Sequence, residues 1–145
     1  MKRSRWRIGM KCLIVEDDAT SCKLLRLYVS KYGGSFESPS GLMAVEAVRQ
    51  ALKDGIPFDV ILLDIMLPDM DGHQTLTEIR HLEKEFNIDP NKAAKVIMVT
   101  ALGDSDNIIH SFRNGANGFI IKPVREDSLA REMAKLGLTP VKSSQ

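Results

Sequence analysis

The sequence predicts an α/β fold in which an open parallel β-sheet carries helices on both faces. Four short apolar runs, at 12–15, 60–63, 96–99 and 119–121, alternate with segments of helical period. This alternation is typical of βαβ units with right-handed crossovers. The runs are rich in valine and isoleucine and lack strict polar alternation, which is typical of strands buried inside a parallel sheet.

Five segments between and after these runs predict helices, because their apolar residues recur at helical spacing and form one stripe on each helix. These stripes are Leu24, Leu25, Tyr28 and Val29; Ala44, Val45, Val48, Ala51 and Leu52; Leu76, Ile79 and Phe86; Ile108, Ile109 and Phe112; and Leu129, Met133 and Leu136. Turn residues separate the elements. Gly33-Gly34 is predicted to end the first helix, residues 55–57 follow the second, and residues 89–91 form the loop after the third.

A sheet of this pattern requires one more strand between the first two helices. The available segment is 35–38, where Phe36 is the single large apolar residue and Pro39 lacks an N–H group for the strand ladder. We therefore predict a weak strand at the edge of the sheet, which brings the total to five.

Length and composition predict one soluble domain. A chain of 145 residues with 43% hydrophobic residues can bury roughly 70% of the surface that its unfolded form exposes. The net charge of +1 argues against nucleic-acid binding through overall charge. Membrane insertion is not expected, because the apolar runs are far shorter than the roughly 18 residues of a membrane span. The two cysteines, Cys12 and Cys22, have no framework spacing, so we expect a reducing compartment, the cytoplasm.

The expected domain covers residues 11–136. A basic N-terminal arm, 1–10, precedes it and is expected to be flexible, and a C-terminal tail, 137–145, follows it. The alternative for the arm is contact with nucleic acid or an anionic membrane surface.

Polar side chains follow the ends of the apolar runs. They are Glu16, Asp17 and Asp18 after the first run, Asp64 after the second, Thr100 after the third and Lys122 after the last. In open α/β sheets, ligands bind outside the carboxyl ends of the strands. These side chains are therefore candidates for one site, although aspartates at strand ends also serve simply as helix caps, and Asp18 is the best candidate for that role.

The chemistry expected at this edge is that of magnesium and phosphate. If the first and third strands are neighbours, Asp17 and Asp64 come close together with Glu16 beside them, and their repulsion requires a cation. Oxygen ligands without histidine or cysteine favour Mg²⁺, which commonly also binds phosphate oxygens. Lys122 would supply a positive charge for a phosphoryl oxygen and Thr100 a hydroxyl donor. Asp64 is then the best nucleophile available.

Four motifs occur in a fixed order along the chain: Leu13-Ile14-Val15-Glu16-Asp17-Asp18, Val60-Ile61-Leu62-Leu63-Asp64 with Pro68 and Gly72, Val99-Thr100-Ala101, and Lys122-Pro123. Together they resemble the CheY-like receiver domain of two-component response regulators. The resemblance extends from about Lys11 to Leu136. It implies a flavodoxin-like, doubly wound sheet of five strands in the order 2-1-3-4-5, flanked by five helices.

The resemblance also implies residue roles. Asp64 would accept a phosphoryl group from a sensor histidine kinase or a histidine phosphotransfer protein, in a Mg²⁺-dependent step that the domain itself catalyses. Asp17 would bind the metal directly, Glu16 through water, and Met66 through its backbone carbonyl, with Asp64 completing the set. Lys122 would contact the phosphoryl oxygens, and the Lys122-Pro123 bond is expected to be cis.

Phosphorylation is then expected to act as a switch. Thr100 would move toward the phosphoryl group and Phe119 would turn inward, which changes the surface of the fourth helix, fifth strand and fifth helix. The changed surface would control a downstream protein, and phosphorylation could also drive formation of a homodimer. Such a domain is not a classical enzyme, because it catalyses only its own phosphorylation and dephosphorylation.

Met66 and Leu102 are apolar at positions where polar residues often lie near the path of the attacking water. We therefore expect slow self-dephosphorylation, although both side chains could simply shield the site. His73, His81 and His110 lie in or beside predicted helices, where exposed or packing roles are expected.

Two alternatives to the signalling function remain. A haloacid-dehalogenase-like phosphohydrolase also uses an aspartate nucleophile, Mg²⁺ and a lysine, but it requires a second aspartate at the position that Met66 occupies. The other alternative is an interaction module that acts independently of phosphorylation.

Overall fold

A parallel β-sheet in the order β2-β1-β3-β4-β5 forms the centre of the computed structural model, which describes residues 9–141. All adjacent strands pair in parallel. The strands are β1 (Met10–Val15), β2 (Gly33–Ser38), β3 (Val60–Leu63), β4 (Lys95–Thr100) and β5 (Gly118–Ile121). The predicted strand order and the edge position of β2 are therefore confirmed.

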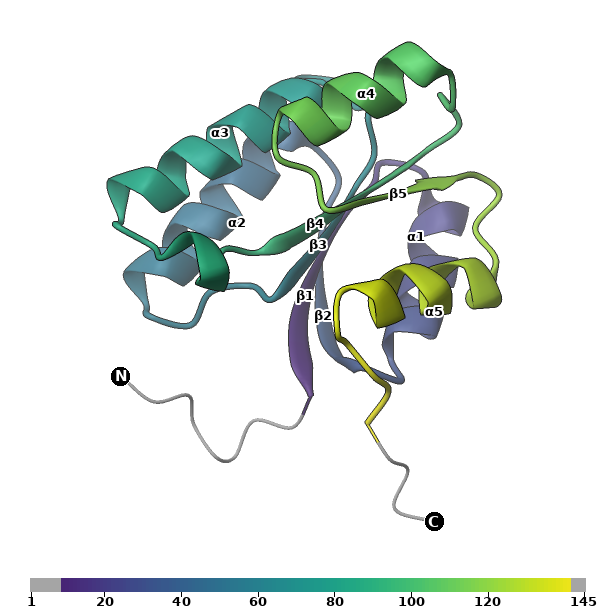
Figure 1. The fold of residues 1–145 in the computed structure, drawn as a ribbon, viewed down its shortest axis with the longest axis horizontal. Coiled ribbons are helices and arrows are strands. Elements are labelled where there is room, and N and C mark those ends of the chain that lie inside the picture. The colour runs from purple at the N-terminus through teal and green to yellow at the C-terminus, as the bar shows by residue number, and fades with distance from the viewer. Residues whose placement is uncertain (1–8, 142–145) are drawn as a thin grey trace.

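Helices cover both faces of this sheet, as predicted. They are α1 (Ala19–Val29), α2 (Gly41–Lys53), α3 (Gly72–Glu85), α4 (Ser105–Arg113) and α5 (Glu126–Lys135), with one short 3₁₀ helix at Pro90–Lys92. In Figure 1, α1 and α5 lie on one side of the sheet, and α2, α3 and α4 on the other. The result is a three-layer doubly wound fold.

The runs 12–15, 60–63 and 96–99 of the three central strands are apolar because both faces of these strands are buried. Along β1, Leu13 and Val15 pack against α2 and α3, whereas Cys12 and Ile14 pack against α1 and α5. Successive side chains of a strand point to opposite faces. From Cys12 to Val15 every side chain of β1 is therefore buried, which explains why this run lacks polar alternation.

The start of β2 differs from the prediction. Gly33 and Gly34 do not end α1; that helix ends at Val29, and the two glycines are the first residues of β2. Gly33 approaches β1 so closely that a Cβ atom there would lie 2.0 Å from the carbonyl oxygen of Met10. Pro39 follows the strand and therefore removes no donor from its ladder.

The apolar stripe of α4 is less buried than the prediction implies. Ile109 and Phe112 keep 48% and 47% of their surface exposed, and Ser111 is the buried residue of this helix. The stripe therefore faces solvent in part, and α4 contributes little to the two cores.

The N-termini of α1, α2, α3 and α4 are capped by the side chains of the residues that precede them. Asp18 accepts a hydrogen bond from the backbone N–H of Ser21, which confirms its predicted role as a cap. Asp71 and Gln74 form a reciprocal capping box at α3. These caps fix where the loops at the carboxyl edge of the sheet turn into helices.

The two ends of the described chain lie at the end of the sheet opposite to the carboxyl ends of the strands. β1 begins at Met10, which is buried, and the N–H of Val141 donates to the carbonyl of Lys31 at 2.8 Å. The expected basic arm lies, up to residue 8, outside the described residues, so its role and the domain boundaries stay predictions. None of the helices in the described part of the chain is long and apolar enough to cross a membrane.

Candidate functional site

The carboxyl ends of β1 and β3 bring three acidic side chains together. Val15 pairs with Leu63 across the two strands, so the residues that follow, Glu16 and Asp64, leave the sheet side by side. Carboxylate oxygens of Glu16, Asp17 and Asp64 all lie within 4.8 Å of one another. The sheet thus assembles the acidic cluster expected from the sequence.

Asp64 is held in one orientation by contacts to both of its oxygens. It is buried, with 5% of its surface exposed. The backbone N–H of Met66 donates to Oδ1 at 3.0 Å, and the Lys122 ammonium donates to Oδ2 at 2.9 Å. The carboxylate therefore faces the edge of the sheet with its position fixed before any ligand arrives.

Lys122 joins two of the three carboxylates. It follows β5, and its Nζ lies 2.5 Å from Oε1 of Glu16 as well as 2.9 Å from Oδ2 of Asp64. Burial lowers the pKa of Lys122, but hydrogen bonds and charge from Glu16 and Asp64 outweigh that effect, and the pKa stays above its ordinary value. The ammonium group is therefore a permanent cation of the site.

Glu16 is the most deeply buried acid of the cluster. Burial raises the pKa of its carboxyl group above the ordinary value, while hydrogen bonds from Lys122 and from the backbone N–H of Asp18 oppose the increase. Asp17, in contrast, is exposed. The site therefore has a closed side at Glu16 and an open side at Asp17, from which a ligand can enter.

Thr100 and Phe119 lie on β4 and β5, the two strands that follow β3 across the sheet. Thr100 is fully buried, and its hydroxyl oxygen accepts a hydrogen bond from the N–H of Leu102 at 3.3 Å. Phe119 pairs with Met98 across the strands and packs, partly buried, against the core on the α2 and α3 side. Thr100 thus ends β4 at the carboxyl edge of the sheet, with its hydroxyl engaged by its own loop, whereas Phe119 lies two residues before the end of β5.

The residues present fit a hard divalent cation. The cluster supplies only oxygen ligands, and three carboxylates against one ammonium leave two negative charges at the edge of the sheet. A dication would neutralise that charge, and the all-oxygen donor set is the kind that Mg²⁺ prefers. The exposed side chain of Met66 adds no ligand atom of this kind.

The Lys122-Pro123 bond, directly after the lysine of the site, is cis, as predicted.

A contact that supports the loop after β3 was not recognised from the sequence alone. Asp69 accepts hydrogen bonds from the backbone N–H groups of Gly41 and Leu42, both at 2.9 Å, which ties the loop after β3 to the start of α2. Asp69 lies 28 positions after Gly41 and 27 after Leu42 in the sequence. No local sequence pattern indicates a contact over that separation, so only the fold reveals it.

The fold and its edge together define a doubly wound α/β protein with an acidic cluster at the switch point of the sheet. Over residues 12–134 the sequence matches the response regulator receiver domain, and the chain belongs to this family.

Curated relatives and solved structures agree with this family. The transcriptional regulatory protein SrrA of Staphylococcus aureus is 35% identical over 111 residues, which cover 77% of this chain and 41% of SrrA. The chain thus spans well under half the length of these curated relatives.

Two of the similar solved structures are complexes. CheY in the CheX–CheY–BeF₃–Mg²⁺ complex of Borrelia burgdorferi is 26% identical with a TM-score of 0.77, covering 91% of this chain and 92% of that one. The receiver domain of the Arabidopsis thaliana histidine kinase CKI1, complexed with Mg²⁺ and BeF₃⁻, is 25% identical with the same TM-score and the same coverage.

Proposed function

We propose that this domain is a phosphorylation switch in which Asp64 accepts the phosphoryl group. The observation that carries the proposal is the position of the Asp64 carboxylate: it is buried, held by the Met66 N–H and the Lys122 ammonium, and adjacent to two further carboxylates. The donor would be a sensor histidine kinase or a histidine phosphotransfer protein, in the cytoplasm.

The transfer requires little acid–base chemistry. An oxygen of Asp64 attacks the phosphorus of a phosphohistidine, a P–O bond forms, and the P–N bond breaks as the electron pair returns to the imidazole of the donor. A carboxylate nucleophile is ionised at neutral pH and needs no general base. The domain contributes position and charge: Lys122, already beside Asp64, neutralises developing charge on the phosphoryl oxygens.

The metal-binding residues would be Asp17 and Asp64 directly, Glu16 through water, and Met66 through its backbone carbonyl. Mg²⁺, when bound, would neutralise the remaining negative charge and bind phosphoryl oxygens. The acidic donor set supports this, and so do two relatives whose complexes contain Mg²⁺.

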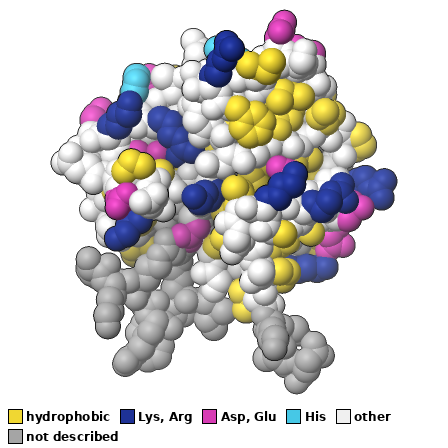
Figure 2. Space-filling model, viewed as in Figure 1, with side chains coloured by type: hydrophobic (Ala, Val, Ile, Leu, Met, Phe, Trp, Pro, Cys, Tyr) yellow, Lys and Arg dark blue, Asp and Glu magenta, His cyan; other side chains and the backbone are white. Residues whose placement is uncertain are grey.

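The output would pass through α4, β5 and α5. Phosphorylation would draw the Thr100 hydroxyl from its Leu102 partner toward the phosphoryl group, and Phe119 would turn inward. A patch of hydrophobic side chains covers the face between α4 and β5 (Figure 2). Phe112 and Ile121 are half exposed and line one cavity with residues of α5, which supports contact with a downstream protein or with a second copy of the chain.

The direct test is phosphorylation by a small acyl phosphate. Incubation with acetyl phosphate and Mg²⁺ should add the mass of one phosphoryl group, measured on the intact protein, and chelation of Mg²⁺ should prevent it. Asp64→Asn should abolish the gain in mass, whereas Asp54→Asn, at an exposed aspartate that follows the last residue of α2, should retain it. An Asp64→Asn protein that is labelled as well as the parent would contradict the proposal, and an unlabelled parent would favour the phosphorylation-independent module.

The metal is tested separately through stability. An ion that binds only the folded state raises the free energy of unfolding by about 2.7 kcal/mol at one hundred times its Kd. Asp17→Asn should remove the stabilisation by Mg²⁺ in urea unfolding while changing stability little without Mg²⁺, because Asp17 is exposed. Stabilisation by Mg²⁺ that is equal in both proteins would place the ion elsewhere.

Turnover assays of the parent and of Asp64→Asn also distinguish the proposed switch from the phosphohydrolase alternative. Met66 offers no carboxyl group at the position where that mechanism needs a second acid, and its side chain is 58% exposed. We expect no sustained turnover of p-nitrophenyl phosphate. Turnover that Asp64→Asn removes would revive the phosphohydrolase alternative.

A further inference from the structure

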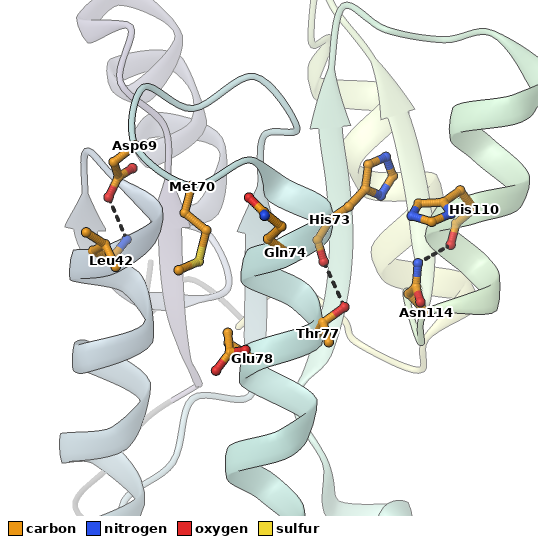
Figure 3. A pocket seen from close by; sticks show the side chains of 9 residues that line it. All are labelled: Leu42, Asp69, Met70, His73, Gln74, Thr77, Glu78, His110 and Asn114. Atoms are coloured by element: carbon orange, nitrogen blue, oxygen red, sulfur yellow. Dashed lines mark hydrogen bonds between the residues drawn. The ribbon is translucent and has the colours of Figure 1, made fainter.

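A second group of possible metal ligands lies outside the acidic cluster, between α3 and α4. A cavity of about 470 Å³ opens there, lined by residues of α2, α3 and α4 and of the loop after β3. Figure 3 shows the imidazole rings of His73 and His110 beside one another, one from α3 and one from α4. Their ring centroids are 4.3 Å apart, with an interplanar angle of 83°.

The hydrogen bonds around His73 determine which of its nitrogens carries the proton. The Asn107 amide nitrogen donates to Oδ1 of Asp104 at 2.6 Å, and a carboxylate only accepts, so the orientation of that amide is fixed. Oδ1 of Asn107 therefore faces Nε2 of His73, at 3.0 Å. Because an amide oxygen only accepts, Nε2 carries the hydrogen and Nδ1 carries the free lone pair.

That lone pair lacks a partner. Among the described residues, Nδ1 of His73 is buried without a hydrogen bond. A buried acceptor is costly to leave unsatisfied. The His73 ring packs edge to face against the ring of His110, an exposed residue three positions after Asn107 on the same helix. His110 can therefore turn about its side-chain bonds to share a ligand with Nδ1.

The charge of the cavity also favours a cation. Its lining contains the carboxylates of Asp69 and Glu78 and, in the described part of the chain, no lysine or arginine. The two imidazole rings provide nitrogen ligands, which suit Zn²⁺, Cu²⁺ and Ni²⁺ and not Mg²⁺. The cavity has space for the waters that would complete the coordination.

We propose that His73 and His110 together bind an imidazole-preferring divalent ion of the Zn²⁺ class, which joins α3 to α4. The chain Asp104–Asn107–His73 orients the first ligand in the way that outer hydrogen bonds orient metal-binding histidines. The site does not depend on phosphorylation of Asp64. Because it includes α4, a bound ion would hold the helix that the proposed switch has to move.

The test is titration of the full chain with Zn²⁺ by calorimetry, with Mg²⁺ present in excess to occupy the acidic cluster. We expect one Zn²⁺ per chain. His110→Ala should weaken binding at least tenfold, and so should His73→Phe. His81→Ala is the matched control, because His81 is exposed on the same helix as His73 yet lies outside the cavity. The Zn²⁺ affinity of His81→Ala should equal that of the parent.

A further variant tests the orienting residue. Asn107→Ala keeps both histidines but releases the His73 ring, and loss of such an outer partner should weaken binding roughly 10–100-fold. His110 is exposed, so His110→Ala alone decides the outcome if His73→Phe does not fold. Zn²⁺ binding that persists in His110→Ala, or that disappears in Asp17→Asn, would assign the ion to another site and overturn the proposal. Absence of binding by the parent would overturn it as well.

Discussion

The first residue of α3, Gly72, lies against the backbone of Asp64: a Cβ atom at Gly72 would be 2.2 Å from the Asp64 carbonyl oxygen. The N–H of Gly72 also donates to the carbonyl of Ile65 at 2.8 Å. The start of α3 thus supports the segment that carries the candidate nucleophile. This close approach explains why the motif after β3 contains a glycine at this position.

Gly72→Ala should therefore destabilise the domain and displace Asp64. Because the contacted atoms belong to the backbone, they cannot turn away as a side chain can. We expect a loss of about 2 kcal/mol, in the range of overpacked sites, together with slower labelling by acetyl phosphate. Urea unfolding measures the first effect and intact mass the second.

The control for this substitution is Gly34→Ala. Gly34 lies in β2, no other atom lies within 4 Å of the place that a Cβ would occupy there, and its φ is not in the left-handed region. Its replacement should change stability by less than about 0.5 kcal/mol. Equal effects of the two alanine substitutions would contradict the role assigned to Gly72.

Lys122→Met should destabilise the domain because it leaves Glu16 and Asp64 buried without their cation. Removal of one partner of a buried ion pair costs roughly 3–5 kcal/mol. The Lys122 side chain keeps 19% exposure, so we expect a smaller loss, about 2 kcal/mol. Mg²⁺ should restore more stability to this variant than to the parent, since it would compensate the same carboxylates. Urea unfolding with and without Mg²⁺ measures both effects.

A matched control is Lys135→Met. Lys135 contacts Glu132 at the same distance, 2.9 Å, but its side chain is 70% exposed. Exposed ion pairs contribute little, about 0–1 kcal/mol. If Lys122→Met proved as harmless as Lys135→Met, the carboxylates at the edge of the sheet would not depend on Lys122.

The sheet could be predicted from the sequence because its central strands are buried on both faces. A continuous apolar run such as 60–63 is stable only where both faces of the strand are buried, inside the sheet. The acids that follow such parallel strands then meet at one edge of the sheet. β2 was harder to place, because an edge strand with one large apolar residue, Phe36, carries no pattern of its own. Its start is set by pairing with β1, from Met10 opposite Gly33 onward.

Contacts between residues distant in the sequence could not be predicted in the same way. The histidines were expected in or beside helices, but the contact of His73 with His110 arises only when α3 and α4 come together. Likewise, Arg80 donates to the carbonyls of Ala94 and Gly115 and pairs with Glu83. Local patterns indicate helices; they do not indicate which polar side chains meet between them.

Both cysteines should be unreactive in the folded protein. Burial raises the pKa of Cys12 far above its ordinary value, and the negative charge of Asp59 adds to the effect. Burial, followed by the charge of Glu37, raises the pKa of Cys22 to about 11. Since only the thiolate reacts, iodoacetamide at about pH 8 should label neither residue in the native state and both in denaturant.

The pH dependence of this reaction has a defined sign. Folding raises the pKa of the Cys22 thiol, so its contribution to stability is present below the ordinary thiol pKa of 9.0 and is lost as the pH rises through about 11. Labelling of Cys22 should accelerate over the same interval. Labelling by mass spectrometry that is equally fast in native and denatured protein would contradict the burial of both side chains.

The lifetime of the phosphorylated protein should depend on Met66. Its thioether side chain is 58% exposed two residues after Asp64 and cannot orient a water for attack on the acyl phosphate. Met66→Asn introduces an amide that can, so we expect dephosphorylation about tenfold faster, equivalent to a barrier about 1.4 kcal/mol lower. Loss of the phosphoryl mass over time measures the rate. Met43→Asn, a change at a 55% exposed methionine on α2, should leave the rate unchanged. A phosphoprotein that is equally long-lived or longer-lived with Met66→Asn would show that the apolar side chain does not slow hydrolysis.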